Sequence, residues 1–369
     1  MQTMPRNEKH ELQIVPTQQE AARQRFVLAL KQDIGGRLRP QLRQVIPSEI
    51  MDQQDSNAIA NILEKSTPRK IWGRLARTAQ ELMWQGVKDP LLRTEKDLIK
   101  KCTALKEKPI AGGSLELDEN LIIPEAMVKV PVHLQPGGYC LDRHQQDILA
   151  GALYEAGGAL FSQGQSINID ESKAELVVRF LHQKLPHFRP SHILDMACSA
   201  GGSSTPYARL FPRADVHAID IAPGLLRYAH ARAESIGVAV HFHQRDVCAP
   251  GFNDNNFDLV VSHNAMHEMS PTTIKAMMKE SYRLLRPGGV AVHQDVPLRN
   301  AELNAFAQAD YAWDYLYNNE PYWNSFAELN LSSTMQDAGF EKTVQFDRVP
   351  QLGGSMDWDL FWAIKKMET

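Results

Sequence analysis

The stretch of sequence that decides the fold reads ILDMACSAGGSS and runs from Ile193 to Ser204. Its apolar start predicts a strand that ends at Asp195, and the small residues after it predict a tight turn. Ser203 or Ser204 is placed to cap a following helix. Gly201 permits backbone torsions that other residues resist, so a ligand can approach the main chain closely. Open α/β sheets bind ligands at this edge, where the strands end.

Strands and helices alternate around this stretch, from about residue 172 onward. Apolar strands are predicted at His192–Met196, Asp215–Ile219, Val238–Phe242, Phe257–Ser262 and Gly289–His293, with two more at 342–348 and 357–364. Helices are predicted between them at Ser204–Leu210, Leu225–Ser235 and Thr272–Leu285. Alternation of this kind predicts an α/β fold, in which helices cover both faces of a mainly parallel sheet.

The segment from Asp195 to Gly201, DMACSAG, resembles the first motif of the class I S-adenosylmethionine-dependent methyltransferases, a family with a Rossmann-like sheet. The family pattern is apolar–Asp–x–Gly–Cys–Gly–x–Gly. Ala197 and Ser199 replace two of its glycines, and because both are small we expect the loop to persist. A NAD-binding domain would normally show G-x-G-x-x-G, which these two replacements break.

The resemblance continues downstream in the family's order. The second strand ends at Asp220, 25 residues after Asp195, where the family binds both ribose hydroxyls. By resemblance, Asp246 accepts a hydrogen bond from the adenine amino group, the backbone at Val247 meets the ring, and Asn264 faces the methionine portion. The resemblance thus implies S-adenosyl-L-methionine as the cofactor. The implied contacts are Asp195, Ala197, Ser199, Gly201, Asp220, Ile221, Asp246, Val247 and Asn264.

Candidates for catalysis follow the fourth strand of the repeat, in SHNAMHEM from Ser262 to Met269. His267 is the first candidate for a general base, since an imidazole titrates near neutral pH. A structural role for it is the alternative, and His263 is a second catalytic candidate. Tyr139, in a PGGY segment, is expected to close the pocket from the N-terminal side by analogy with relatives.

An aromatic segment lies before the last two predicted strands. It contains Tyr311, Trp313, Tyr315, Tyr317, Tyr322 and Trp323. Small-molecule methyltransferases build their substrate wall in this region, and aromatic faces can hold a cation. Ordinary packing of a lid is an equal alternative.

The first part of the chain lacks this alternation of strands and helices. Residues 1–140 predict a mainly helical domain or cap, and residues 141–369 the methyltransferase-like domain. Within the cap, a helix is predicted from Ile71 to Val87, closed by Asp89-Pro90. Ile71, Leu75, Ala79 and Leu82 share one face of it. The neighbours Trp72, Met83 and Trp84 widen this apolar stripe, which is expected to pack against other helices. Short extended pieces such as Val128–Val130 and a helix over 142–161 are expected to follow. A homodimer through the N-terminal helices is a further hypothesis.

Composition limits the function classes. The chain has 369 residues and a net charge of −4, without a basic stripe, which argues against nucleic-acid binding. Its four cysteines lie far apart with no C-x-x-C spacing, so neither a disulfide framework nor a metal site is expected. No apolar run of membrane-spanning length and no signal peptide is present. We therefore expect a cytoplasmic protein that does not bind membranes.

Three hypotheses follow for function. The first is methyl transfer to oxygen, nitrogen or carbon of a small metabolite. The second is a non-methyl reaction of the same cofactor, such as cyclisation of its aminobutyrate arm to azetidine-2-carboxylate with release of methylthioadenosine. The third is a protein that binds the cofactor without turnover. The presence of both Asp220 and Asp246 disfavours the third.

Overall fold

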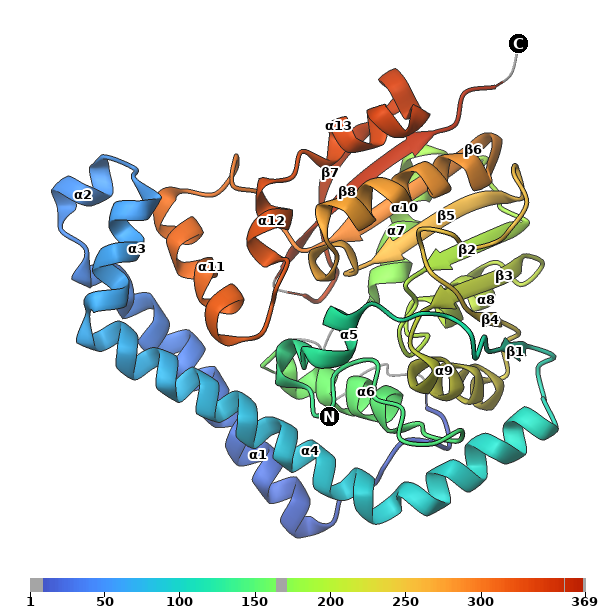
Figure 1. Ribbon diagram of the computed structural model, residues 1–369, viewed down its shortest axis with the longest axis horizontal. Coiled ribbons are helices and arrows are strands. Elements are labelled where there is room, and N and C mark those ends of the chain that lie inside the picture. Colours follow the sequence, from blue (N-terminus) through green and yellow to red (C-terminus); the bar gives the residue numbers. More distant parts are fainter. Residues whose placement is uncertain (1–8, 164–170, 355, 368–369) are drawn as a thin grey trace.

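The computed structural model describes residues 9–163, 171–354 and 356–367. A single sheet forms its centre, with the strand order β1-β4-β3-β2-β5-β6-β8-β7 (Figure 1). The strands are β1 (Ser114–Glu116), β2 (His192–Met196), β3 (Asp215–Asp220), β4 (His241–Gln244), β5 (Phe257–His263), β6 (Leu285–Asp295), β7 (Gln345–Pro350) and β8 (Asp357–Ile364). Each pair from β1 to β6 in this order is parallel, while β8 runs antiparallel to both β6 and β7. The predicted α/β fold is confirmed.

Helices cover both faces of the sheet because the side chains of each strand alternate between two cores. Ile193 and Leu259 belong to the core under one set of helices, and Leu194 and Val260 to the core under the other. Strands buried on both faces read as continuous apolar runs. The first set comprises α7 (Lys173–Lys184), α8 (Ser204–Leu210) and α9 (Pro223–Ile236); the second comprises α10 (Pro271–Leu284), α12 (Trp323–Glu328) and α13 (Leu331–Met335).

Local sequence signals explain several helix boundaries. Ser172 and Glu175 form a reciprocal capping box at the start of α7. Gly237 ends α9 in the left-handed conformation, with φ +86°. The Val238 N–H still donates to the Ala233 carbonyl, at 3.1 Å. The strand predicted at Val238–Phe242 therefore begins only at His241.

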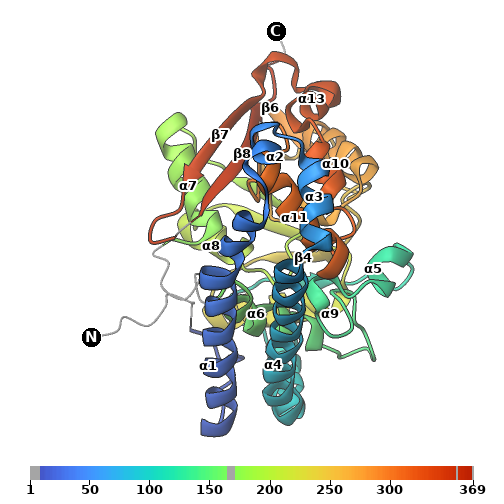
Figure 2. The ribbon, with the colours of Figure 1, turned by 90° about the vertical axis from the view of Figure 1, so that its left-hand side faces the viewer.

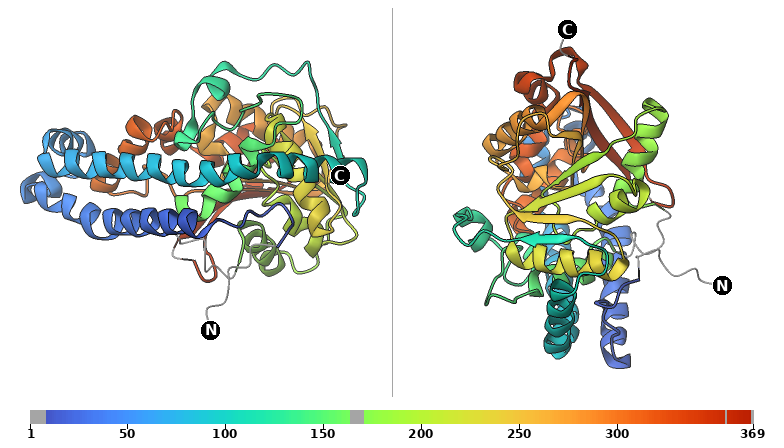
Figure 3. Two further views of the ribbon diagram at one scale, coloured as in Figure 1. Left: turned by 90° about the horizontal axis from the view of Figure 1, so that it is seen from below. Right: turned by 90° about the vertical axis from the view of Figure 1, so that its right-hand side faces the viewer.

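The N-terminal part is helical up to residue 107. It contains α1 (Gln18–Asp33), η1 (Ile34–Leu38), η2 (Arg39–Val45), α2 (Ser48–Asp52), α3 (Ser56–Lys65) and α4 (Thr67–Glu107). Helices α1 and α4 lie side by side (Figures 2 and 3). At one end, α3 and α4 pack on α11 (Ala305–Tyr317), and further along α4 packs on α6 (Leu149–Phe161) and α9. The helical part is thus joined to the sheet domain along most of α4.

The prediction for α4 was wrong in two respects. The helix does not stop at Pro90 but continues through it for 41 residues in all. Its packing on α6 and α9 on both sides of Pro90 outweighs the unfavourable proline. Only part of the predicted apolar stripe is buried, because Ala79, Trp72 and Met83 are 1%, 4% and 0% exposed while Ile71 and Leu82 are 56% and 42% exposed. Both sides of this helix carry apolar residues, so periodicity alone did not select the buried side.

The connection to the sheet domain also differs from the prediction. Val128 and Lys129 are helical, in α5 (Glu125–Lys129), where an extended piece was expected. The helix predicted over 142–161 starts at Leu149, whose N–H donates to the Asp147 carboxylate at 3.0 Å. Strand β1 pairs with β4, so a segment assigned to the N-terminal part extends the sheet. The predicted domain boundary at residue 140 stays a prediction.

The remaining elements are short. They are η3 (Val132–Leu134), η4 (Met266–Glu268), η5 (Gln336–Phe340) and η6 (Glu341–Thr343). Within the described ranges, no helix combines the length and apolar character that crossing a membrane requires.

Candidate active site

The turn after β2 has the backbone of a glycine-rich loop. Ala197, Ser199 and Gly201 all have positive φ, at +59°, +49° and +74°. This region costs a residue with a Cβ about 1–2 kcal/mol. The N–H of Cys198 donates to the carbonyl of Ile219 at 2.9 Å, which fixes the turn to β3. The left-handed torsions of the family motif are thus present although two of the three positions carry a side chain.

Asp195 ends β2 without exposed surface. Its Oδ2 accepts hydrogen bonds from the hydroxyls of Ser203 (2.6 Å) and Ser204 (2.7 Å). Its Oδ1 has no partner among the described residues. Burial raises the pKa of Asp195 to about 6, although the two serines oppose this. Neither serine caps α8, contrary to the prediction, because both hydroxyls are directed to this carboxylate.

Asp220 ends β3 and connects two loops. Its Oδ2 accepts the N–H of Ser199 at 2.9 Å, and its Oδ1 accepts the N–H of Ala222 at 3.0 Å. Burial raises the pKa of Asp220, and these backbone hydrogen bonds limit the rise. The neighbouring Ile221 is half-buried, and its carbonyl accepts a hydrogen bond from Gln244 at 3.1 Å. Asp220 therefore lies directly beside the turn after β2.

The other predicted cofactor residues lie at the same edge of the sheet. Asp246 and Val247 follow β4; Asp246 is half-buried and accepts the N–H of Cys248 at 2.8 Å, and Val247 is buried. Asn264 follows β5 with φ +50°, and its side-chain oxygen accepts a hydrogen bond from Gln294 at 2.9 Å. The structure thus brings all these residues to the carboxyl ends of β2, β3, β4 and β5.

His263 does not have the surroundings of a base. The Tyr207 hydroxyl lies 3.0 Å from its Nε2, and the Gln294 side-chain oxygen lies 3.2 Å from its Nδ1. Burial lowers the pKa of His263 to about 4. Both ring nitrogens serve contacts within the fold, so the geometry gives this histidine a structural place and argues against the catalytic role predicted for it.

His267 lies in η4 and is 5% exposed. Its Nδ1 is 2.5 Å from a carboxylate oxygen of Asp295, at the end of β6. Burial lowers the pKa of His267, but Asp295, Glu268 and Glu320 outweigh burial and raise it to about 9. The ring is held by a carboxylate on one side and meets further carboxylates on the other. The role of a general base for His267 stays a prediction.

His133 and Glu320, which the sequence analysis did not select, lie beside His267 and Glu268. His133, in η3, has its Nε2 2.9 Å from Glu268 Oε1, and its Nδ1 contacts Glu320 Oε1. Burial lowers the pKa of His133, but the two carboxylates raise it to about 10. We call His133, His267, Glu268 and Glu320 the His–Glu cluster. No local pattern could have revealed it, because its members come from three segments far apart in the chain.

Two tyrosines connect the His–Glu cluster with the turn after β2. The Tyr139 hydroxyl donates to Glu268 Oε1 at 3.2 Å. Its ring packs edge-on against Tyr154, with centroids 5.6 Å apart, and the side chain of Ser199 opposes the rise that burial causes in the pKa of Tyr154. Burial raises the pKa of Tyr139, and the adjacent Glu268 acts in the same direction. Tyr139 therefore lies between the two groups of candidate residues.

The N-terminal helices position His133. The carbonyl of His133 accepts hydrogen bonds from Trp84 Nε1 at 2.7 Å and from Gln80 Nε2 at 3.0 Å, both on α4. The side chain of Asn319 also donates to the Pro131 carbonyl, at 3.1 Å. These contacts hold η3 over the carboxyl ends of β5 and β6.

The aromatic segment does not form one continuous wall. Trp313 is buried against α4, while Tyr315 and Tyr317 are exposed. Trp323 meets the ring of His267 edge-on, at a centroid distance of 5.6 Å. The segment therefore serves mainly to pack the helical part on the sheet domain, and Trp323 reaches the cluster.

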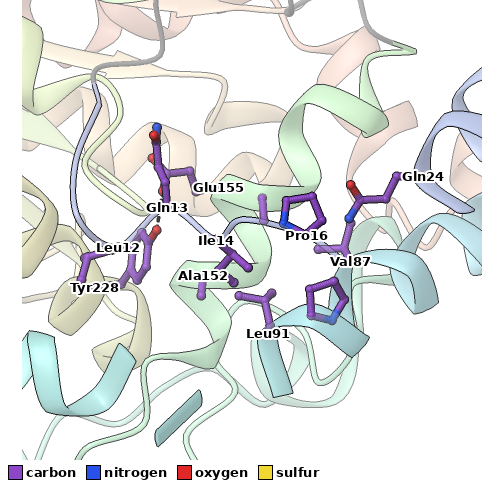
Figure 4. Close-up of a pocket in the computed structure, with 12 residues that line it drawn as sticks. Leu12, Gln13, Ile14, Pro16, Gln24, Val87, Leu91, Ala152, Glu155 and Tyr228 are labelled. Atoms are coloured by element: carbon purple, nitrogen blue, oxygen red, sulfur yellow. Dashed lines mark hydrogen bonds between the residues drawn. The ribbon is translucent and has the colours of Figure 1, made fainter. Parts of the chain in front are cut away.

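Two cavities lie elsewhere in the described part of the chain. One, of about 260 Å³, opens between the N-terminal segment and helices α4, α6 and α9, with Ile14, Leu91 and Tyr228 in its wall (Figure 4). The other, of about 170 Å³, lies beside α3, α11 and α12. Neither is lined by the His–Glu cluster or by the predicted cofactor residues.

Comparison with known proteins identifies the domain. Residues 193–289 match the family described as methyltransferase domain, a range that starts in β2 and ends in β6. This part of the chain is therefore similar to methyltransferase domains. The helical N-terminal extension lies outside the matched range, as does the C-terminal part from residue 290.

Curated proteins similar to this part of the chain include two methyltransferases. Demethylmenaquinone methyltransferase of Thermus thermophilus is 32% identical over 108 residues, which are 29% of this chain and 48% of that protein. Ubiquinone biosynthesis O-methyltransferase of Azorhizobium caulinodans is 26% identical over 175 residues, 45% of this chain and 66% of that protein. The chain therefore spans about half to two thirds of these relatives. A crystal structure of a SAM-dependent methyltransferase from Methanosarcina mazei aligns at 21% identity with a TM-score of 0.40, over 51% of this chain and 98% of that one.

Proposed function

We propose that this protein is an S-adenosylmethionine-dependent methyltransferase that modifies oxygen, nitrogen or carbon of a small molecule. The observation that carries the proposal is the set of acidic residues at consecutive strand ends: Asp195, Asp220 and Asp246 surround a left-handed turn at the carboxyl edge of a parallel sheet. Ligands of open α/β sheets bind at this edge. The family match over the same residues supports the assignment.

The residues present fit the cofactor. Asp195 Oδ1 is a buried acceptor without a partner, and such an atom favours a ligand that donates a hydrogen bond. Asp220 already accepts two backbone hydrogen bonds, and each carboxylate oxygen has a further lone pair for a ribose hydroxyl. S-adenosylmethionine supplies a methyl group on a positively charged sulfur. Around it, the chain's task is to hold donor and acceptor in line and to exclude water.

We place the acceptor beside the His–Glu cluster, at the carboxyl ends of β5 and β6. Tyr139 and Trp323 flank the cluster, and Tyr139 connects through Tyr154 to the turn that would hold the donor. His267 presents its Nε2 on this side because Asp295 holds its Nδ1. His133 and Glu320 cover the cluster from the helical part and from the segment after α11. A buried position of this kind suits a small molecule better than a nucleic acid.

The proposal is tested by incubating purified protein with S-adenosylmethionine that carries an isotopic label on its methyl group, with and without a metabolite extract. Mass spectrometry should find S-adenosylhomocysteine and a labelled small molecule when the extract is present. Methylthioadenosine formed without any acceptor would replace the proposal by cyclisation or a related cleavage. Tight cofactor binding without turnover in any extract would instead favour a binding protein.

We also propose a homodimer through the N-terminal helices. Its support is an apolar row on the outer side of α4, where Ile71, Leu75 and Leu82 are 56%, 37% and 42% exposed. Residues three and four apart share one side of a helix. Sedimentation velocity should give a dimer for the natural chain and a monomer for Leu75→Glu. A monomeric natural chain would refute this part of the proposal.

A further inference from the structure

Four metal-binding side chains converge in the His–Glu cluster. Each offers one nitrogen or oxygen, and these atoms all lie within 4.8 Å of one another. Glu268 Oε1 is 2.9 Å from His133 Nε2 and 3.7 Å from His267 Nε2. A tetrahedral Zn²⁺ about 2.0–2.1 Å from each ligand separates the ligand atoms by roughly 3.3 Å. These two separations lie on either side of that value, while Glu320 Oε1 contacts the second ring nitrogen of His133, Nδ1.

The carboxylates of the cluster have unused binding capacity. Glu268 Oε2 and Glu320 Oε2 are buried without a hydrogen-bond partner among the described residues, and the two side chains are 9% and 1% exposed. An unsatisfied buried acceptor costs about 1–3 kcal/mol, more when it is charged. A divalent cation would give both oxygens a partner.

The surroundings of the cluster are those that orient metal ligands. Histidines that bind metals almost always donate their other ring N–H to a carboxylate, carbonyl or water. His267 Nδ1 meets Asp295 in this way at 2.5 Å, which leaves Nε2 for an ion. Phe161 and Trp323 pack edge-on against His133 and His267, with centroids 4.6 and 5.6 Å apart, and shield them from water.

We propose that His133, His267, Glu268 and Glu320 bind one divalent transition-metal ion, of which Zn²⁺ fits two imidazoles and two carboxylates best. Two neutral imidazoles, two carboxylates and one such ion carry no net charge, which suits a buried position. The proposal departs from the expectation of no metal, which rested on cysteine spacing. It also means that the ion ties η3, η4 and the segment after α11 together.

The position of the ion bears on chemistry, and this step rests on the proposed function. Four protein ligands close a tetrahedral Zn²⁺ site, so the ion would hold η3, η4 and the segment after α11 around the place assigned to the acceptor and would not contact the acceptor itself. His267 Nε2 is then a ligand of the ion and takes no proton from the acceptor.

The test is calorimetric titration of ZnCl₂ into the full chain after treatment with a chelator and dialysis. The natural protein should bind one Zn²⁺ per chain. Glu320→Gln and His133→Gln should each weaken that binding at least tenfold, because each removes a ligand. Asp295→Asn should weaken it by about 10- to 100-fold through the orientation of His267. Cofactor affinity, measured on the same samples, should stay within twofold in Glu320→Gln.

A matched control comes from a second group of similar residues, Glu95, His144 and Asp147. There Arg143 already pairs with both carboxylates. His144→Ala should leave zinc binding unchanged. The metal site would be overturned if the natural protein did not bind zinc stoichiometrically. It would also be overturned if Glu320→Gln, His133→Gln and Asp295→Asn bound zinc as tightly as the natural protein. If Glu320→Gln does not fold by circular dichroism, Asp295→Asn decides. Zinc binding without cofactor binding would keep the site and overturn the proposed methyl transfer instead.

Discussion

At the scale of single residues, the turn after β2 combines a strained backbone with a carboxylate that supports it. Ala197 and Ser199 adopt torsions that suit glycine, and the N–H of Ser199 is held by Asp220. The acid that the family resemblance assigns to ribose binding therefore also fixes the shape of the neighbouring turn. Strain of this kind persists only where surrounding contacts over-determine it.

Asp220→Ala should weaken S-adenosylmethionine binding by about 1.5–3 kcal/mol, because charge-assisted hydrogen bonds to the ribose are lost. Isothermal titration calorimetry measures this directly. Asp215→Ala is the matched control, since Asp215 begins the same strand at its opposite, exposed end. Equal affinities of the natural protein and Asp220→Ala would show that a different acid binds the ribose.

At the scale of elements, α4 joins the two parts of the molecule. It carries Trp84 and Gln80, which hold η3 and thereby His133, and it packs on helices from both parts. Its buried side includes Met83 and Val87, whereas Ile71 and Leu82 of the predicted apolar stripe are exposed.

Met83→Ala should lower the free energy of unfolding by about 2–5 kcal/mol, because a fully buried side chain leaves a cavity. Leu82→Ala, one position earlier and 42% exposed, should change it by less than about 1 kcal/mol. Urea denaturation followed by circular dichroism compares the two. Equal losses would mean that α4 packs with both sides, as it would in a dimer that buries Leu82.

At the scale of the whole molecule, Glu155 on α6 gathers partners from distant segments. It accepts hydrogen bonds from Arg232 on α9 at 2.8 Å and from Tyr228, and it lies 3.0 Å from His10 of the N-terminal segment. Burial raises the pKa of Glu155, but His10, Arg232 and Tyr228 outweigh burial and lower it to about 2. Its ionised form is therefore favoured by folding.

Because of Glu155, the free energy of unfolding should depend on pH in the acid range. A carboxyl whose pKa falls from 4.5 to about 2 on folding stabilises the protein fully above pH 4.5, and this contribution is lost as the pH falls toward 2. At about 1.4 kcal/mol per pKa unit, the contribution is at most roughly 3.5 kcal/mol. Urea denaturation should find Glu155→Gln less stable than the natural protein at pH 6, and about a quarter of that difference should remain at pH 2.5. Glu81→Gln, on the exposed side of α4, should show no such difference at either pH. A difference as large at pH 2.5 as at pH 6 would contradict the assignment.

The sequence by itself determined the α/β alternation, the strand that ends at Asp195 and the acids that follow at Asp220 and Asp246. These features depend on local signals: apolar runs of strand length, small residues in turns, and polar residues where strands end. Each signal is complete within one β-α unit, so no knowledge of distant contacts was needed.

Only the tertiary structure decided which side of α4 is buried and which polar residues form the His–Glu cluster. His133, His267 and Glu320 come from segments that meet only after α4 and the segment after α11 have packed on the sheet domain. The roles of His263 and His267 were likewise decided by neighbours distant in sequence, Gln294 and Asp295. The physical reason is that burial and charge at a site are sums over all nearby groups, whichever part of the chain supplies them.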